Sequence, residues 1–460
     1  MCETFLTARI CRLEKVLAKP GSVSDARRAA FEILRRVEDG AFASVLLASK
    51  EDNLTPPDRG LTHELVLGVL RHQLWLDRLA EYYTQRKSEQ LDAEVRLILR
   101  LGLYQLRFLT RVPASAAVNE SVNLAGVARK RSAGGLINAV LRKAAMDKDY
   151  DPVTEINEPI ERLAVETSHP TWLIERWTRA FGFEETQNFA RANNQSAPVA
   201  FRVVRNRARE SEVLNVLRES GGDVIPSTVA PNAFRITGST RMLAKLAAEG
   251  RVYIQDEGSQ LLTSVLDPHP GERLLDLCAA PGSKTTHIAD VTNDGAFIVA
   301  GDLHQHRLKT VQSTSTLQGF RSVNCLTLDG LQSLPVPENF FDRVLIDAPC
   351  SGTGTLRRNP EIRWRISTGD IKDLAARQTK LLINAARTVR VGGRVVYSTC
   401  SVEIEENEGV RQTFLDNSKN FRPLELNVQT TFRTDQGVAR TWPHRQGSDG
   451  FFISAFERLS

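Results

Sequence analysis

Apolar residues recur at helical spacing over the first third of the chain. Ser24 or Asp25 can cap a first helix that Gly40 ends, and its apolar face comprises Ala26, Ala30, Ile33, Leu34 and Val37. A second run begins after Asp58 and extends to residue 79. Three more runs of the same period cover residues 97–109, 116–129 and 133–145. Amphipathic helices joined by short loops predict an all-α bundle.

The pattern becomes mixed between residues 151 and 250. A helix is predicted from Thr171, and short apolar runs predict strands at residues 199–204 and 233–236. A helical run over residues 210–220 lies between the two strands. This order predicts a small α+β domain that links the bundle to the rest of the chain.

From residue 252 onward, short apolar strands alternate with helices. The strands are predicted at residues 273–278, 296–302, 323–329, 343–347 and 394–398, and one long helix at 371–389. Such alternation is typical of a parallel sheet that helices cover on both faces. The tail, residues 437–459, is predicted to form an antiparallel hairpin that turns at 447–450.

These patterns predict a multidomain protein. A leader at residues 1–22, disordered or frayed, precedes a helical domain at 23–150, a linking α+β domain at 151–250 and an α/β domain at 251–460. The length of 460 residues suits two to four domains of about 100–200 residues each.

The composition excludes membrane-spanning and secreted proteins. No run reaches the roughly 18 apolar residues that span a bilayer, and the N-terminal segment carries charges in place of an apolar signal core. The cysteines form no CxxC pair, which argues against a zinc site and a disulfide framework; they are Cys2, Cys11, Cys278, Cys325, Cys350 and Cys400. We expect a cytoplasmic monomer that holds no metal and contacts no membrane.

Positive charge is concentrated at the N-terminal end. Residues 1–150 hold 24 Lys and Arg against 18 Asp and Glu, whereas residues 251–460 hold 24 of each sign. This excess favours a module in the first third that faces a polyanion. On charge alone, an ordinary solvated surface is an equal alternative.

Residues 273–285, RLLDLCAAPGSKT, run from a predicted strand through a tight loop into a helix. Doubly wound sheets bind ligands at the carboxyl ends of their strands, and Ala279, Ala280 and Gly282 would let a ligand approach the backbone closely. The loop lacks the Gly-Lys pair of a phosphate-binding P-loop and the GxGxxG fingerprint. It therefore predicts a ligand site of another kind.

Two carboxylates extend this candidate site. Asp302 and Asp329 end the next two strands, where the first can accept hydrogen bonds from a ribose diol and the second can face an adenine. Each residue alone is more often a strand-end cap. Together with the loop, they favour one binding site along the same sheet edge.

Two cysteines follow the last two predicted parallel strands. The fourth strand ends in Asp347-Ala-Pro-Cys350 and the fifth in Tyr397-Ser-Thr-Cys400. Cysteines are normally buried apolar residues, but these two stand in small, polar turns, which favours exposed and reactive thiols. Asp347 beside them offers an acid or a hydrogen-bond acceptor.

These motifs resemble the bacterial Sun (RsmB) family of 16S ribosomal RNA cytosine-C5 methyltransferases over residues 24–460. The segments that carry the resemblance are LDLCAAPGSKT at 275–285, DAPCSGTG at 347–354, RRNPEIRW at 357–364, STCS at 398–401 and EENE at 405–408. The resemblance implies a helical domain similar to the NusB antitermination factor, a small linking domain and a Rossmann-like methyltransferase domain.

The resemblance also implies roles for individual residues. Cys400 would be the nucleophile, and Cys350 would assist release of the methylated product. The cofactor S-adenosyl-L-methionine would be bound, or its pocket lined, by Cys278, Ala279, Ala280, Pro281, Gly282, Ser283, Lys284, Asp302, Asp329 and Asp347. The family commonly has Gly where this chain has Ser283, a difference that bears on one backbone approach.

The chemistry explains why two cysteine motifs are needed. C5 of cytosine becomes a nucleophile once a thiolate has attacked C6, and a proton held near N3 or N4 by Asp347 would favour that adduct. The target base must leave its stack to reach the pocket. Phosphates and a base could be held by Arg357, Arg358, Arg363, Trp364 and Arg365, although such a cluster can also be a solvated face.

Three alternatives remain open at this point. DNA cytosine-C5 enzymes use the Pro-Cys cysteine, here Cys350, as nucleophile, whereas the Ser-Thr-Cys400 motif favours Cys400. Transfer RNA is a possible substrate because sibling families share the catalytic domain; the NusB-like domain favours ribosomal RNA. A non-catalytic assembly factor would be expected to lose one of the cysteine motifs, and both are intact.

Overall fold

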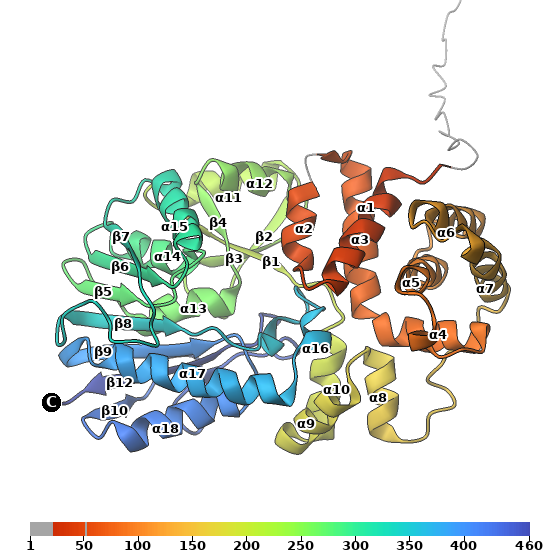
Figure 1. The fold of residues 1–460 in the computed structure, drawn as a ribbon. Helices are drawn as coiled ribbons and strands as arrows, with labels where there is room; N and C mark the ends of the chain where they lie inside the picture. The colour runs from red at the N-terminus through yellow and green to blue at the C-terminus, as the bar shows by residue number, and fades with distance from the viewer. Residues whose placement is uncertain (1–21, 51–52) are drawn as a thin grey trace, which may run out of the picture. The chain divides into compact units, whose positions relative to one another are not determined.

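A computed structural model describes residues 22–50 and 53–460 (Figure 1). The chain divides into two compact units, residues 1–168 and 169–460, which are described separately. All of the predicted leader except residue 22 lies outside the described residues, together with Cys2 and Cys11.

The first unit is all helical, as predicted. Its α-helices are α1 (Asp25–Glu38), α2 (Ala43–Lys50), α3 (Pro56–Arg71), α4 (Gln73–Thr84), α5 (Ala93–Phe108), α6 (Ala114–Val127), α7 (Gly134–Met146) and α8 (Pro159–Thr167). The predicted second helix is two helices, because the chain turns at His72, whose ring stacks on Phe108 at 4.3 Å between centroids. The apolar faces meet in one core around α5.

The first unit extends past the predicted boundary at residue 150. Trp75 Nε1 donates to Asp151 Oδ1 at 3.0 Å, and Arg78 of α4 pairs with Glu161 of α8 at 3.3 Å. The sequence pattern indicated neither α2 nor α8, because each is short and buries few residues.

The second unit begins with two helices and a four-stranded antiparallel sheet. The helices are α9 (Thr171–Phe181) and α10 (Phe183–Ala192), and the strands follow the order β2 (Gly222–Pro226), β3 (Ala233–Gly238), β1 (Val199–Val203) and β4 (Val252–Ile254). Helices α11 (Glu210–Glu219) and α12 (Arg241–Ala248) share an apolar core with this sheet. Strand β4 lies beyond residue 250, so the small sheet extends past the predicted boundary.

A mixed sheet forms the rest of this unit. Its strands are β5 (Arg273–Asp276), β6 (Phe297–Asp302), β7 (Val323–Thr327), β8 (Phe341–Asp347), β9 (Val389–Thr399), β10 (Phe421–Leu424), β11 (Ala439–Arg440) and β12 (Phe452–Arg458). The order is β10-β12-β9-β8-β5-β6-β7, and β11 pairs with β12. Strands β5 to β9 are parallel as predicted, whereas β12 and β10 are antiparallel to their neighbours.

Alternating side chains place one apolar core on each face of this sheet. Leu274 packs with α13 (Glu257–Leu266), α14 (Ser283–Val291) and α15 (Gln305–Gln318), whereas its neighbour Leu275 packs on the other face with α17 (Thr368–Ala386) and α18 (Val410–Asn417). Figure 1 shows α17 and α18 along the strands. The predicted layers, helices on both faces, are therefore confirmed.

The connections create a switch point at β5. The chain passes from β5 outward through β6 to β7 and then returns to the other side of β5 with β8 and β9. In open α/β sheets, ligands bind beyond the carboxyl ends of the strands at such a point. Among the described helices, none is long and apolar enough to cross a bilayer.

Candidate active site

The two cysteines meet at the carboxyl ends of neighbouring strands. Strands β8 and β9 run parallel with Asp347 opposite Ser398, so the loops that follow them start side by side. Cys350 Sγ lies 3.2 Å from Cys400 Sγ, and both residues are half-buried. The structure therefore places two thiols in contact.

Close backbone contacts fix the two cysteine loops to each other. Gly354 N donates to Cys400 O at 2.9 Å, and Gly450 N donates to Gly354 O at 2.8 Å. A Cβ atom on Gly354 would lie 2.1 Å from Gly450 O, so only glycine fits. The residues 447–450, predicted as a hairpin turn, thus also support the loop that carries Cys350.

A buried ion pair lies beside the thiols. Lys284 Nζ contacts Asp347 Oδ2 at 2.6 Å, and Ser398 Oγ donates to Asp347 Oδ1 at 2.7 Å. Burial lowers the pKa of the Lys284 ammonium, but Asp347 outweighs burial, and the pKa is raised overall. Lys284 therefore remains a cation, and it interacts electrostatically with Cys400.

The thiol of Cys350 is held in its protonated form. The hydrogen bond with Cys400, followed by burial, by the charge of Cys400 and then by the carboxylates of Glu406 and Asp347, raises the pKa of Cys350 well above its usual value. The two thiols thus stand in different fields: a cation acts on Cys400 and a carboxylate on Cys350.

The loop after β5 has the shape expected of a ligand cradle. Gly282 takes a φ of +106°, and a Cβ atom there would meet Val311 Cα at 3.1 Å, so glycine is required by the backbone and by the packing of α15. Ala279 and Ala280 are buried beneath the loop, and Ser283 begins α14. Burial raises the pKa of Cys278, which keeps that thiol neutral.

A buried acceptor near this loop fits S-adenosylmethionine. Asp276 is fully buried at the end of β5, where Thr285 Oγ1 donates to its Oδ2 at 2.7 Å while Oδ1 has no hydrogen-bond partner. Burial raises the pKa of Asp276 to about 7. An unpaired buried acceptor beside a glycine turn suits a ligand that brings its own donors.

The two predicted carboxylates follow β6 and β7. Asp302 accepts a hydrogen bond from His304 N at 3.0 Å and lies 3.4 Å from Arg307 Nη1. Asp329 is half-buried and accepts one from Leu331 N at 2.9 Å. Both are therefore placed along the same edge of the sheet as the loop, with one backbone contact each.

The arginine-rich segment differs from its predicted role. Arg357 and Arg363 are 3% and 0% exposed, so neither forms the surface cluster expected for phosphate contacts. Arg357 Nη2 donates to Gly447 O at 2.9 Å, Arg358 Nε contacts Asp449 Oδ2 at 2.7 Å, and Arg363 Nη1 donates to Asn194 Oδ1 at 2.9 Å.

Arg357 and Arg358 reach back into the protein to the buried carboxylate of Asp449, whereas Arg363 bonds to the amide of Asn194. Trp364 and Arg365 are half-buried.

Three polar residues of the site were not singled out in the sequence. They are Asp276, Ser398 and Glu406, which lie inside the motifs LDLC, STCS and EENE respectively. Glu406 is fully buried and accepts a hydrogen bond from Ser351 N at 2.8 Å. Their position within those motifs was the available signal. The contacts of Ser398 with Asp347 and of Glu406 with Ser351 join residues more than 50 positions apart in the sequence.

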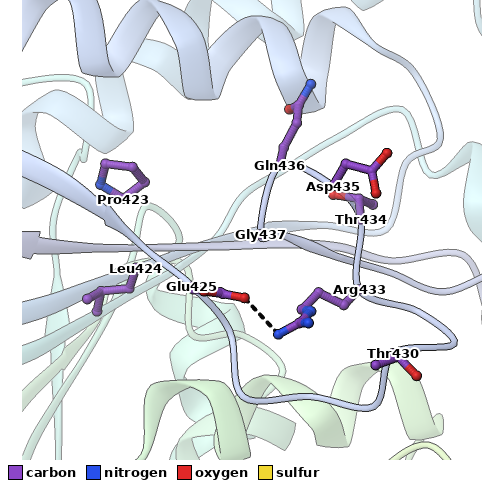
Figure 2. Close-up of a pocket in the computed structure, with 9 residues that line it drawn as sticks. All are labelled: Pro423, Leu424, Glu425, Thr430, Arg433, Thr434, Asp435, Gln436 and Gly437. Atoms are coloured by element: carbon purple, nitrogen blue, oxygen red, sulfur yellow. Dashed lines mark hydrogen bonds and ion pairs between the residues drawn. The ribbon is translucent and has the colours of Figure 1, made fainter.

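A separate groove lies between β10 and residues 430–437 (Figure 2). Arg433 Nη1 lies 2.8 Å from Glu425 Oε1 across it. None of the predicted site residues lines this groove. In the described part of the chain, no group of three or more His, Cys, Asp or Glu side chains is placed to hold a metal ion.

A Rossmann-like sheet with a ligand cradle after its first strand and acidic residues after the next ones defines a methyltransferase that uses S-adenosylmethionine. Family models agree part by part: the NusB family matches residues 24–146, a ferredoxin-like domain of RsmF/B-like methyltransferases matches 169–243, and 16S rRNA methyltransferase RsmB/F matches 263–457. The chain belongs to the RsmB/F family.

Individual relatives cover nearly the whole chain. A protein of Bacillus subtilis (strain 168) named "Probable ribosomal RNA small subunit methyltransferase B" is 34% identical over 94% of this chain and 98% of its own length. The ribosomal RNA small subunit methyltransferase B of Escherichia coli (strain K12) is 34% identical over 91% and 95%. The crystal structure of PH0851 has a TM-score of 0.82 at 29% identity and covers 96% of this chain and 99% of that one.

Family membership makes the chain an enzyme, an S-adenosylmethionine-dependent rRNA methyltransferase. The predicted fold class and cofactor are confirmed with it.

Proposed function

We propose that the chain methylates C5 of one cytosine in 16S ribosomal RNA through a covalent bond between Cys400 and C6. The observation that carries this proposal is the contact of 3.2 Å between two thiols that follow neighbouring strands. Methylation of an exocyclic amine or a ribose hydroxyl needs no thiol, whereas attack on C6 needs one and its reversal benefits from a second.

Cys400 is the proposed nucleophile because a cation stands by it. The Lys284 ammonium interacts electrostatically with Cys400, so a positive charge lies beside the sulfur that attacks C6. After methyl transfer, C5 gives up its proton to water and the bond between C6 and the Cys400 sulfur breaks. Cys350 keeps its own proton and contacts that sulfur, so it can stabilise the departing thiolate. This division supports the predicted release role of Cys350.

Asp347 and Lys284 are proposed to read the base. Their ion pair is only partly exposed, and it presents a carboxylate and an ammonium side by side to a base that has left its stack. The carboxylate can accept a hydrogen bond from the N4 amino group, and the ammonium can hold a proton near N3. Both contacts favour addition at C6.

The cofactor is proposed to lie against residues 278–284, with Asp302, Asp329 and Asp347 around it. S-adenosylmethionine, when bound, supplies a methyl group that is electrophilic because it is attached to a sulfonium. The chain contributes an unpaired carboxylate oxygen on Asp276 and the turn at Gly282. Ser283 lies at the start of α14, where a helix N-terminus favours negative charge on a ligand.

The parts of the chain are proposed to divide the work. Residues 23–150 contact ribosomal RNA, residues 151–250 link, and residues 251–460 carry the chemistry, with the protein acting as a cytoplasmic monomer. Arg35 and Arg36 at the end of α1 are exposed and suit phosphate contacts. Transfer RNA is the second candidate substrate. It is supported only because the same pair of thiols could act on a cytosine of any RNA.

Bisulfite sequencing tests the proposal directly. In a strain that lacks this gene, one cytosine of 16S rRNA should lose its methyl mark, and the native chain should restore it while Cys400→Ala should not. Loss of a mark from transfer RNA alone would overturn the ribosomal substrate, and no change in any RNA would overturn C5 methylation.

A further inference from the structure

The motif at residues 405–408 has no role in the mechanism described so far, yet it contains the most heavily bonded carboxylate near the thiols. Glu406 lies in a π-helical turn, η5 (Glu405–Gly409), directly before α18. Such turns are rare and recur at functional sites. Here the turn directs two consecutive side chains, Glu406 and Asn407, into the protein, where both are fully buried.

Each carboxylate oxygen of Glu406 accepts two hydrogen bonds. Oε1 accepts hydrogen bonds from Ser351 N at 2.8 Å and from Gln378 Nε2 at 2.8 Å. Oε2 accepts one from Ser401 Oγ at 2.5 Å and one from Ser351 Oγ. Burial raises the pKa of Glu406, and the hydrogen bonds from these partners oppose that rise because all four donate to the carboxylate.

These partners come from both cysteine loops. Ser351 follows Cys350 directly and Ser401 follows Cys400, so one carboxylate ties the residues next to the two thiols. Asn407 strengthens the second attachment, since its Nδ2 donates to Ser401 O at 2.9 Å and its Oδ1 accepts from Thr399 Oγ1 at 2.5 Å.

We propose that Glu406 is a positioning residue of the methyl-transfer reaction: it holds the two cysteine loops in register and its charge keeps the proton on Cys350. The inference rests on the proposed function, in which Cys400 attacks and Cys350 stays protonated. The charge argument follows from the contact of Glu406 with Ser351, because a nearby negative charge disfavours a second one. Cys400 and Asp347 also raise the pKa of Cys350, so Glu406 is one of three groups that act on this thiol.

Glu406→Gln separates charge from shape. The amide can keep its oxygen toward Ser351 N and Gln378 while the two serine hydroxyls rotate to accept from its NH2 group. We expect kcat to fall about tenfold with an unchanged KM for RNA and unchanged cofactor affinity. Glu406→Ala should lower kcat about a hundredfold. Glu405→Gln, one residue away and half-exposed, is the matched control and should keep the native kcat.

The decisive readout is the reactivity of Cys350 itself, measured without RNA or cofactor. In a Cys400→Ala background, alkylation of the Cys350 peptide by iodoacetamide is followed against pH by mass spectrometry. Adding Glu406→Gln should move the midpoint down by about one pH unit, whereas Glu405→Gln should leave it in place. The alkylation midpoint does not depend on which RNA is methylated. It therefore tests the effect of Glu406 on Cys350 even if the proposed function is wrong.

An unshifted midpoint, or a native kcat in Glu406→Gln, would overturn the proposal. If Glu406→Ala does not fold, Ser351→Ala replaces it, because this change removes one hydrogen bond to Glu406 and leaves the backbone contact. It should lower kcat about threefold, as expected for one hydrogen bond, and a native kcat there would count against the register role.

Discussion

The loop that carries Cys350 and the arginine-rich segment at residues 357–365 follow one another directly but use polar side chains in opposite ways. In the loop, short side chains remain at the rim of the sheet, and the thiol faces Cys400 at 3.2 Å. In the segment, Arg357 turns inward to Gly447 and Asp449. The loop therefore keeps its thiol at the sheet edge, whereas Arg357 is held inside the protein.

The difference shows that the length of a side chain and the partners within its reach decide whether it stays at the sheet edge or turns into the protein. A cysteine or serine that follows a strand end cannot reach far, so the strand fixes where it lies. A guanidinium can extend to a carboxylate on another segment, and Asp449 is such a partner for both Arg357 and Arg358. The arginines thereby hold the turn at residues 447–450, which in turn contacts Gly354 of the cysteine loop.

The largest effect is expected from the thiol that attacks. Cys400→Ala should lower the methylation rate by at least about a thousandfold, because it removes the thiol that is proposed to form the C6 bond. Its affinity for S-adenosylmethionine, measured by calorimetry, should remain native. A residual rate within tenfold of the native one would contradict the assignment.

The next effect concerns the arginines and falls on stability. Arg357→Ala should lower the free energy of unfolding by about 3 kcal/mol, since it removes a buried partner of Asp449. Urea denaturation measures this change, and Arg241→Ala at an exposed site is the control, expected within about 0.5 kcal/mol of native. If Arg357→Ala keeps the native stability but binds RNA more weakly, Arg357 contacts RNA phosphates as the sequence predicted.

A somewhat smaller effect is expected from the ion pair beside the thiols. Asp347→Asn should lower kcat about a hundredfold, because the base loses a charged acceptor and Lys284 loses its partner. Single-turnover kinetics with saturating RNA separate this loss from binding. If the loss appears only in KM, Asp347 binds the base without assisting the addition.

The smallest effect is expected where arginines are exposed. The double change Arg35→Ala and Arg36→Ala should weaken RNA binding about tenfold and reduce the slope of log affinity against log salt by about 2, with kcat unchanged. Binding titrations at several salt concentrations measure both quantities. An unchanged slope would mean that this end of α1 does not contact RNA. The exposed and the buried arginines would then not differ in RNA binding.

The sequence predicted the elements whose apolar pattern is regular. Strands β5 to β9 and helix α17 bury one strong stripe or run each, so their positions follow from periodicity alone. The antiparallel placement of β12 between β9 and β10 depends on contacts with strands far away in the chain, which a local pattern does not contain. The break between α3 and α4 at His72 was missed, and the stack of His72 on Phe108 that accompanies it is also a tertiary contact.

For the candidate site, the sequence predicted where residues lie in the sheet more accurately than it predicted their contacts. Cys350, Cys400 and Asp347 were placed at strand ends, and the parallel pairing of β8 with β9 then brings them together. The links of Asp347 to Lys284 and of Glu406 to Ser351 and Ser401 join separate loops, and nothing local to either residue indicates them. The burial of Arg357 and Arg363 was not predicted, because a charge run is the same in sequence whether its partners are phosphates or groups inside the protein.

The central claim is that Cys400 attacks while Cys350 assists release, and one denaturing gel tests it. Cys350→Ala incubated with 16S rRNA and S-adenosylmethionine should accumulate a protein–RNA complex that survives denaturation, because the adduct forms and resolves slowly. Cys400→Ala under the same conditions should give none. A trapped complex from Cys400→Ala and none from Cys350→Ala would reverse the roles of the two thiols and contradict the account.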